Sequence, residues 1–278
     1  MSIPTTNPLF KHFRQPAVYL RLPSGGLFWD ESALDMPVTG EIPVYPMTVK
    51  DEITFKTPDA LMNGSGVVEV IQSCCPNIKN AWNIPSIDVD AVLIAIRLAS
   101  YGNSMDINSK CPNCSEENEN VVDLRILLDT LPSVSFDPVK LDKLTFYFKP
   151  QNFKLMNESN LITFEQEKLI RAINNSDLDE TQKLAEFNKI FPNLTDMNVM
   201  VIVNSIEKIV TEDGVEVTET KLIKEFVYNC DRQLFNDIKS NIDRIIKEQA
   251  LKPLDIVCDS CNTEYQSDLT FEQSNFFG

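Results

Sequence analysis

The chain has 278 residues, of which 43% are hydrophobic and 24% are charged; this composition is typical of globular proteins and excludes a disordered or low-complexity chain. Its 25 Lys and Arg residues stand against 41 Asp and Glu residues, which gives a formal net charge of −16. A phosphate backbone repels a chain this acidic, and no run of Lys and Arg with aromatic residues between them offsets the repulsion, so we expect no nucleic-acid partner.

We also expect no membrane partner and no secretion. The longest apolar stretch, Val89–Leu98, contains Asp90 and Arg97 and is too short to span a bilayer. The first 20 residues lack the apolar core of a signal peptide, which favours a protein that is made and kept in a cytosol.

The first half of the chain predicts short extended segments followed by helices. Alternating side chains before Pro23–Gly26 are typical of a strand that runs into a turn. Thr48 is a preferred N-cap residue, and the segment between Ser86, as its cap, and Gly102 has little polar surface, which predicts a central, buried helix. The expected elements are a strand at Val18–Leu22, an extended stretch at Ile42–Met47, and helices from Thr48, from Val67 to before Pro76, and from Ser86 to Gly102.

The second half predicts one strand and a run of helices. Asp213-Gly214 supplies the positive φ angles of a tight turn, so Val210–Val217 is expected to form a hairpin. Residues 150–250 are expected to form a mostly helical module, and a bundle is favoured over a long coiled coil because the heptad pattern is short and broken. The expected elements are a strand at Leu141–Phe148 and helices at Phe153–Asn174, Asp179–Ile190, Thr195–Ile206 and Asp231–Gln249.

Four of the seven cysteines form two Cys-x-x-Cys pairs, Cys111 with Cys114 and Cys258 with Cys261. Two residues between the ligands let both sulfurs reach one ion, and two such pairs complete a tetrahedral Zn²⁺ site. Each pair lies between two segments of strand character, so the pairs predict the two halves of a zinc ribbon. A site of four thiolates without an open position is structural rather than catalytic.

The two pairs are unusually far apart. Between Cys114 and Cys258 lie 143 residues, whereas a compact ribbon has roughly 15–20. Closing a loop of on the order of 100 residues costs about 5 kcal/mol, and structural zinc contributes roughly 10–16 kcal/mol. One zinc ion shared by both pairs is therefore favoured; a redox dithiol and unrelated buried thiols are the alternatives. The other cysteines, expected in the core, are Cys74, Cys75 and Cys230.

No group of residues in the sequence demands catalysis. A histidine-dependent nucleophilic triad would have to use His12, which has no cysteine or serine motif near it. Gly64-Ser65-Gly66 lacks the lysine of a phosphate-binding loop. Carboxylates at helix starts are expected for capping alone, so capping is favoured over a magnesium or acid–base site for both carboxylate groups. These groups are Asp88 with Asp90, and Asp177 with Asp179 and Glu180.

Several short segments follow one another in order between Val18 and Leu124. They are Leu20–Gly25, Tyr45–Glu52, Asp59–Gly64, Cys74–Pro76, Asp88–Asp90, Ala95–Gly102 and the first Cys-x-x-Cys pair. In this order they resemble the T4-type phage base plate protein family, the hub-associated subunits of contractile-tailed phages. The resemblance covers less than half of the chain, and it implies a role in tail or baseplate assembly without enzymatic activity.

The expected fold is α+β, with a small N-terminal β portion, a helical core, and a Cys₄ zinc ribbon that carries a mostly helical insertion between its knuckles. The expected division has four parts. They are residues 1–47 (N-terminal arm and β portion), 48–149 (helical core with the first zinc knuckle), 150–250 (helical insertion module) and 251–278 (second zinc knuckle and C-terminal strand).

The expected function is that of a non-enzymatic structural or assembly protein of a contractile phage tail baseplate. It binds other hub, baseplate or tail proteins, is stabilised by structural Zn²⁺, and is found in the host cytoplasm during assembly and then in the virion tail baseplate. The alternatives are a tail assembly chaperone absent from the mature virion and a zinc-ribbon regulatory adapter. The arm Ser2–Pro16 has too little apolar content to fold alone, so we expect it to contact a partner.

Overall fold

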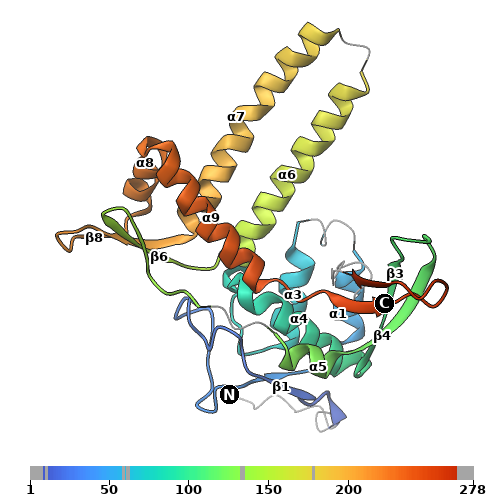
Figure 1. Cartoon of the computed structure of the whole chain (residues 1–278). Helices are drawn as coiled ribbons and strands as arrows, with labels where there is room; N and C mark the ends of the chain where they lie inside the picture. Colours follow the sequence, from blue (N-terminus) through green and yellow to red (C-terminus); the bar gives the residue numbers. More distant parts are fainter. Residues whose placement is uncertain are drawn as a thin grey trace, which may run out of the picture.

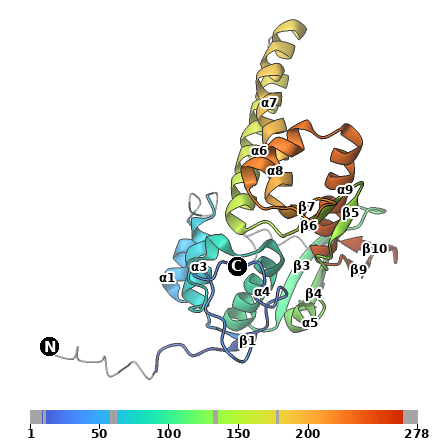
Figure 2. The ribbon, with the colours of Figure 1, turned by 90° about the vertical axis from the view of Figure 1, so that its left-hand side faces the viewer.

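The computed structural model of the chain describes residues 9, 12–57, 60, 63–131, 135–176 and 179–267, without the side chains of 189–195. Within these residues, the buried apolar side chains form two hydrophobic cores. We call the part around the first core the N-terminal lobe and the part around the second core the helical lobe. The helical lobe lies above the N-terminal lobe in the views of Figures 1 and 2.

The N-terminal lobe is packed around one central helix, α4 (Ser86–Tyr101), of which eight residues are buried. Ala91 and Ile94 are inaccessible to solvent, and apolar residues occur on all sides, as in a helix that has no solvent-facing stripe. The expectation of a central, buried helix is therefore confirmed. Around α4 lie an antiparallel strand pair, β1 (Val18–Leu20) and β2 (Ile42–Val44), the helices α1 (Val49–Phe55), α3 (Ser65–Cys74) and α5 (Leu124–Asp129), and the 3₁₀ helix η2 (Ala81–Asn83).

The helix ends in this lobe have the expected capping residues, with one exception. Thr48 caps α1 in a capping box, and Gly102 ends α4 with a φ of 89°. Ser86 does not cap α4, because Pro85 occupies the N-cap position and the Ser86 hydroxyl instead donates to Oε1 of Gln249, 3.0 Å away in the helical lobe. Ser86 therefore connects the two lobes.

The helical lobe is built on a four-stranded antiparallel sheet in the order β5-β6-β7-β8. Phe146 and Phe148 of β6 are almost completely buried, because the helices of this lobe pack over the sheet. The strands are β5 (Val139–Leu141), β6 (Leu144–Phe148), β7 (Ile206–Val210) and β8 (Glu216–Val217). The helices are α6 (Phe153–Asn174), α7 (Glu180–Asn204), α8 (Thr220–Asn229) and α9 (Arg232–Gln249).

Several elements of the helical lobe differ from the sequence-based expectation. The single strand expected at Leu141–Phe148 is a hairpin, because Asp142 turns the chain with a φ of 53° between β5 and β6. The two helices expected on either side of Pro192 are one helix, α7, since a proline removes only one helical hydrogen bond and the flanking turns continue the helix. The helix α8 was not expected, whereas the hairpin around Asp213-Gly214 is formed by β7 and β8.

The helices α6 and α7 lie side by side and project beyond the rest of the helical lobe (Figure 1). Helices and antiparallel strands are mixed along the chain, so the α+β fold class is confirmed. Among the residues that the structure describes, no helix has the length and apolar character that crossing a bilayer requires.

Candidate metal centre

Two β-hairpins that are far apart in the sequence meet beside the N-terminal lobe (Figures 1 and 2). The first consists of β3 (Ser104–Lys110) and β4 (Glu117–Asp123), and the second of β9 (Leu254–Val257) and β10 (Glu264–Ser267). In both hairpins, the turn between the strands contains one Cys-x-x-Cys pair. The sequence-predicted site residues are thus placed on two short, rigid turns.

The two turns have the same backbone construction. The amide of the residue after the second cysteine donates to the carbonyl of the first cysteine, Ser115 N to Cys111 O and Asn262 N to Cys258 O, both at 2.9 Å. Ser115 and Asn262 also share a left-handed conformation, with φ angles of 63° and 57°, which few non-glycine residues adopt. The hairpins are therefore two copies of one local motif.

The turns bring the four thiols together. The Sγ atoms of Cys111, Cys114, Cys258 and Cys261 lie within 4.8 Å of one another, and Cys111–Cys261 and Cys114–Cys258 are each 3.6 Å apart across the hairpins. A disulfide requires a sulfur–sulfur distance of about 2.05 Å, and all four are free thiols. A Zn–S bond of about 2.3 Å places the corners of a tetrahedron about 3.8 Å apart, so this donor set fits zinc.

The thiols differ in how readily they ionise. Hydrogen bonds with the Thr263 side chain and backbone, and one from the Asn113 amide, lower the pKa of Cys261 to about 6. A backbone hydrogen bond from Glu116 lowers the pKa of the exposed Cys114, but hydrogen bonds with the thiols of Cys261, Cys258 and Cys111 raise it to about 12. Four thiolates repel one another in this space, and a bound divalent cation would keep them deprotonated.

Polar side chains join the two hairpins beside the thiols. Asn118 of β4 is buried; its Oδ1 accepts from Asp259 N at 3.0 Å, and its Nδ2 donates to the Tyr265 hydroxyl at 3.2 Å. The Tyr265 hydroxyl also lies 2.7 Å from Ser109 Oγ. These contacts could not be predicted from the sequence, because Asn, Ser and Tyr have no spacing that marks them as partners, whereas the cysteines do.

The remaining cysteines lie outside this cluster. Cys74 and Cys75 are fully buried in the N-terminal core, as expected, and burial raises the pKa of Cys74 to about 12. Cys230 follows the end of α8 and is only partly buried.

Asp88 has a structural role that goes beyond the helix start. The residue is fully buried and accepts hydrogen bonds from Ser24 N at 2.8 Å, Ser24 Oγ at 2.5 Å and Trp29 Nε1 at 2.7 Å. Burial raises its pKa, and these hydrogen bonds oppose that effect. The carboxylate fixes the chain between β1 and β2 onto α4, so these contacts favour a structural role over magnesium or acid–base chemistry.

The other candidate carboxylates are explained in part. Asp179 caps α7 in a capping box with Gln182, as the capping interpretation predicts. Asp90 is partly exposed, and burial raises its pKa. Asp177 lies outside the described residues.

The end of the N-terminal arm is fixed to the N-terminal lobe by Arg14. Its guanidinium donates to Pro46 O at 2.6 Å, to Asp51 Oδ2 at 3.2 Å, and to Ser73 O and Oγ at 2.8 and 2.9 Å. These bonds make the segment around Arg14 part of the fold, which its low apolar content did not reveal. The beginning of the arm, residues 1–8, lies outside the described residues.

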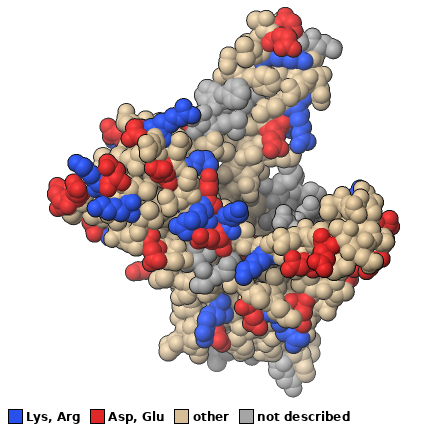
Figure 3. Space-filling model, viewed as in Figure 1, with Lys and Arg blue, Asp and Glu red and all other residues tan. Residues whose placement is uncertain are grey.

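Acidic and basic side chains are interspersed on the face of the molecule shown in Figure 3. On this face, the described Lys and Arg residues form no continuous patch. Basic residues also pair with carboxylates, for example Arg244 with Glu248 and Lys208 with Glu216, both at 2.9 Å. The two signs of charge are therefore mixed on this face rather than separated.

Comparison with protein-family models gives a match that covers most of the chain. A protein-family model described as T4 bacteriophage base plate protein matches residues 30–278. The match extends beyond the short segments of the resemblance, because it also includes the helical lobe and the second cysteine-bearing hairpin. No curated protein and no solved structure matches the chain significantly.

Proposed function

The chain belongs to the T4 bacteriophage base plate protein family, and from this premise we propose that it is a non-enzymatic structural and assembly subunit of a contractile phage tail baseplate. Its proposed place is the baseplate hub, where it binds other hub or tail proteins. Family membership supports the baseplate role. The structural use of Asp88 and Asp179, the best carboxylate candidates for chemistry, supports the absence of an enzymatic activity.

We further propose that Cys111, Cys114, Cys258 and Cys261 hold one structural Zn²⁺ ion. The observation that carries this proposal is that two turns with the same backbone hydrogen bond, far apart in the sequence, bring four free thiols within 4.8 Å of one another. Zinc bound by four thiolates supplies a cross-link and has no open position for a water molecule. The hydrogen bonds that Asn113 and Thr263 make near Cys261 orient this ligand.

The proposed zinc ion holds the two connections of the helical lobe at one point. The chain leaves the first hairpin at the end of β4, passes through α5 to α9, and returns to the second hairpin at β9. A cross-link between these hairpins fixes where the helical lobe sits relative to the N-terminal lobe. This supports a subunit that presents the helical lobe in a fixed orientation to its neighbours.

The division of the chain into residues 1–47, 48–149, 150–250 and 251–278 is also a proposal. The two separate hydrophobic cores support a division into an N-terminal and a helical part, but they favour a boundary earlier than residue 150, because Phe146 and Phe148 already belong to the second core, while Phe153 packs in the first. Limited proteolysis tests the boundaries, since early cleavage should fall between these parts. Early cleavage inside α4 or β6 would contradict the division.

Mass spectrometry of purified virions tests the proposed function. Presence of the chain at a fixed ratio to other tail proteins is expected of a baseplate subunit. Absence from virions, with binding to tail proteins in infected cells, would instead identify a tail assembly chaperone. Co-purification with a polymerase or another enzyme in place of tail proteins would identify a regulatory adapter.

Metal analysis of the purified chain tests the zinc proposal separately. We expect about one zinc per chain, and none in the Cys258→Ser/Cys261→Ser variant. Cys230→Ser is the matched control, because this cysteine lies outside the cluster and its loss should leave the zinc content unchanged. A wild-type chain that holds no metal after purification would contradict the proposal.

A further inference from the structure

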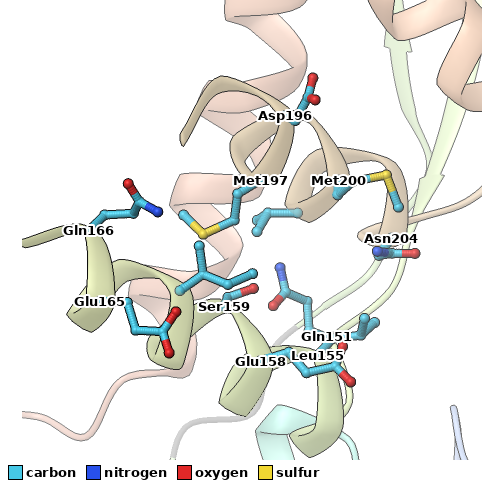
Figure 4. Close-up of a pocket in the computed structure, with 12 residues that line it drawn as sticks. Gln151, Leu155, Glu158, Ser159, Glu165, Gln166, Asp196, Met197, Met200 and Asn204 are labelled. Carbon is cyan, nitrogen blue, oxygen red and sulfur yellow. The ribbon is translucent and has the colours of Figure 1, made fainter. Parts of the chain in front are cut away.

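A groove of about 530 Å³ lies between α6 and α7 and extends from Gln151 and Asn204, at the base of the helix pair, to Gln166 (Figure 4). Its apolar lining includes Leu155 and Ile162 from α6 and Met197 and Met200 from α7. Ile162 is 38% exposed, and methionine side chains adapt their shape to different partners. The groove therefore offers an apolar surface to a partner rather than a closed core.

The charged residues that line the groove are all acidic. Glu158 and Glu165 of α6 and Asp196 of α7 line it, and no Lys or Arg does so among the residues that the structure describes. Two of these carboxylates have partners already: Glu158 lies 4.0 Å from Lys154, and Asp196 accepts from the Tyr228 hydroxyl at 2.6 Å. The lining still favours an occupant that carries positive charge.

One polar group in the groove has no hydrogen-bond partner among the described side chains. Gln166 is only 9% exposed, and its Oε1 accepts no hydrogen bond from the described part of the chain. Its amide lies beside Met197 in the groove wall (Figure 4). Leaving a buried acceptor unpaired costs about 1–3 kcal/mol, so a donor supplied by an occupant would be stabilising.

We propose that this groove binds a cationic amphipathic helix of a neighbouring tail protein. The apolar face of that helix packs between α6 and α7, and its Lys and Arg side chains lie against the carboxylates of Glu158, Glu165 and Asp196. A third helix suits a groove bounded by two helices, because its ridges fit between theirs. The inference rests on the proposed function only in naming a tail protein as the source of the helix.

Two other occupants fit the groove less well. The C-terminal segment 268–278 of this chain contains Asp268 and Glu272 but no Lys or Arg, so it lacks the complementary charge. A second copy of the chain brings another net charge of −16, and like charges across an interface are unfavourable.

Binding of a fluorescein-labelled model peptide tests the proposal. The peptide is an acetylated 14-residue helix of Leu and Lys with all Leu on one face, and a Leu–Glu peptide of the same pattern is its control. Fluorescence anisotropy at 0.15 M NaCl is used with the full chain. We expect saturable binding of the Leu–Lys peptide and at least about tenfold weaker binding of the Leu–Glu peptide.

Two matched pairs of variants separate groove binding from attraction to an acidic protein. Glu165→Lys and Ile162→Lys alter the groove, whereas Glu167→Lys and Phe164→Lys make the same changes on α6 at residues that do not line it. We expect each groove variant to weaken binding by about fivefold or more and each control to stay within about twofold. Equal losses in the groove variants and the controls would overturn the proposal.

Hydrogen exchange provides a second readout on the wild-type chain. Bound Leu–Lys peptide should protect the amides of 155–166 and 196–204 more than those of α9. Protection elsewhere, with none at these segments, would also overturn the inference. Circular dichroism confirms that each variant is folded. If virions contain the chain but the groove variants bind the peptide as tightly as the control variants, the inference alone fails and the proposed function stands.

Discussion

The two cysteine-bearing hairpins and the α6–α7 pair are joined in opposite ways. The hairpins come from segments 144 residues apart, and they meet through four converging thiols and the buried side chain of Asn118. The helices α6 and α7 follow one another along the chain, but a groove remains between them, and Gln166 Oε1 there accepts no hydrogen bond from the residues that the structure describes. The contact between the distant hairpins is closely packed, whereas the contact between the consecutive helices α6 and α7 leaves a groove.

This difference follows from chain entropy. Bringing distant segments together costs more conformational entropy than bringing consecutive ones together, so the contact between them needs strong and specific interactions. A short connection keeps α6 and α7 close in any case, and their packing is free to stay incomplete and leave a surface for a partner. Substitutions in the hairpins should therefore change the free energy of unfolding more than substitutions in the α6–α7 pair.

The largest effect is expected from opening the cysteine cluster. Cys258→Ser/Cys261→Ser should lower the free energy of unfolding by about 3–5 kcal/mol, the scale of a cross-link that closes a loop of on the order of 100 residues. Differential scanning calorimetry, with and without a zinc chelator, measures the change. The chelator should destabilise the wild type and leave the double variant unaffected. Equal stability of the wild type and the double variant would contradict the idea that the cysteine cluster stabilises the contact between the hairpins.

A second distant contact, between Arg14 and Asp51, predicts sensitivity to acid. Burial alone would raise the pKa of Asp51, but hydrogen bonds from Thr48 and Ser73 and the charge of Arg14 lower it below its ordinary value of 3.8. A depressed pKa contributes stability above the unfolded-state value, and that stability is lost as the pH falls through the folded-state value. The contribution of Asp51 should therefore be complete above about pH 4 and decline progressively as the pH falls further.

Thermal unfolding of Asp51→Asn between pH 7 and pH 2.5 measures this contribution. The variant should be less stable than the wild type by about 1.5–3 kcal/mol at neutral pH, as expected for hydrogen bonds to a charged group, and the two proteins should converge in acid. Asp243→Asn is the control, because Asp243 makes an exposed ion pair with Lys239 worth less than about 1 kcal/mol. A constant difference at all pH values would contradict the assignment.

The polar contacts beside the thiols predict an effect at Asn118. Asn118→Ala leaves Asp259 N without its acceptor and should cost about 1–3 kcal/mol. Asn108→Ala on the neighbouring strand is a matched control, since Asn108 is exposed and should change stability by less than about 0.5 kcal/mol. Chemical denaturation measures the stability of both variants. Similar losses of stability in the two would show that the contact between the hairpins depends on the thiols alone.

A smaller and local effect is expected in the α6–α7 pair. Asp179 caps α7, so Asp179→Ala should cost about 1 kcal/mol. Hydrogen exchange should speed up in the first turns of α7 and stay unchanged in β3 and β4. Faster exchange in the cysteine-bearing hairpins would show that the stabilities of the two regions are coupled rather than independent.

The smallest effect is expected in the groove itself. Ile162→Ala removes a side chain that is 38% exposed and should cost less than about 1 kcal/mol. Ile223→Ala is the matched core variant, because Ile223 of α8 is buried and its truncation should cost about 2–5 kcal/mol. A loss at Ile162 as large as that at Ile223 would mean that the groove is part of the core.

The sequence revealed those features whose signal is local. The spacing of the two cysteine pairs predicted the cluster of four thiols, and the apolar pattern of α4 predicted a central, buried helix. The contacts of Arg14, Asp88 and Asn118 join residues far apart in the sequence, and nothing local marks their partners. The continuity of α7 was missed because the proline rule considers one residue, whereas a helix of 25 residues is held by many other bonds.

The wide spacing of the cysteine pairs also sets a time order during synthesis. Cys258 leaves the ribosome 144 positions after Cys114, which at about 5–20 residues per second corresponds to about 7–30 s. During that interval the first pair offers only two thiolates to a metal ion, while the helical lobe is still being made. Full coordination by four thiolates would thus be a late event that reports the completed return of the chain to its first hairpin.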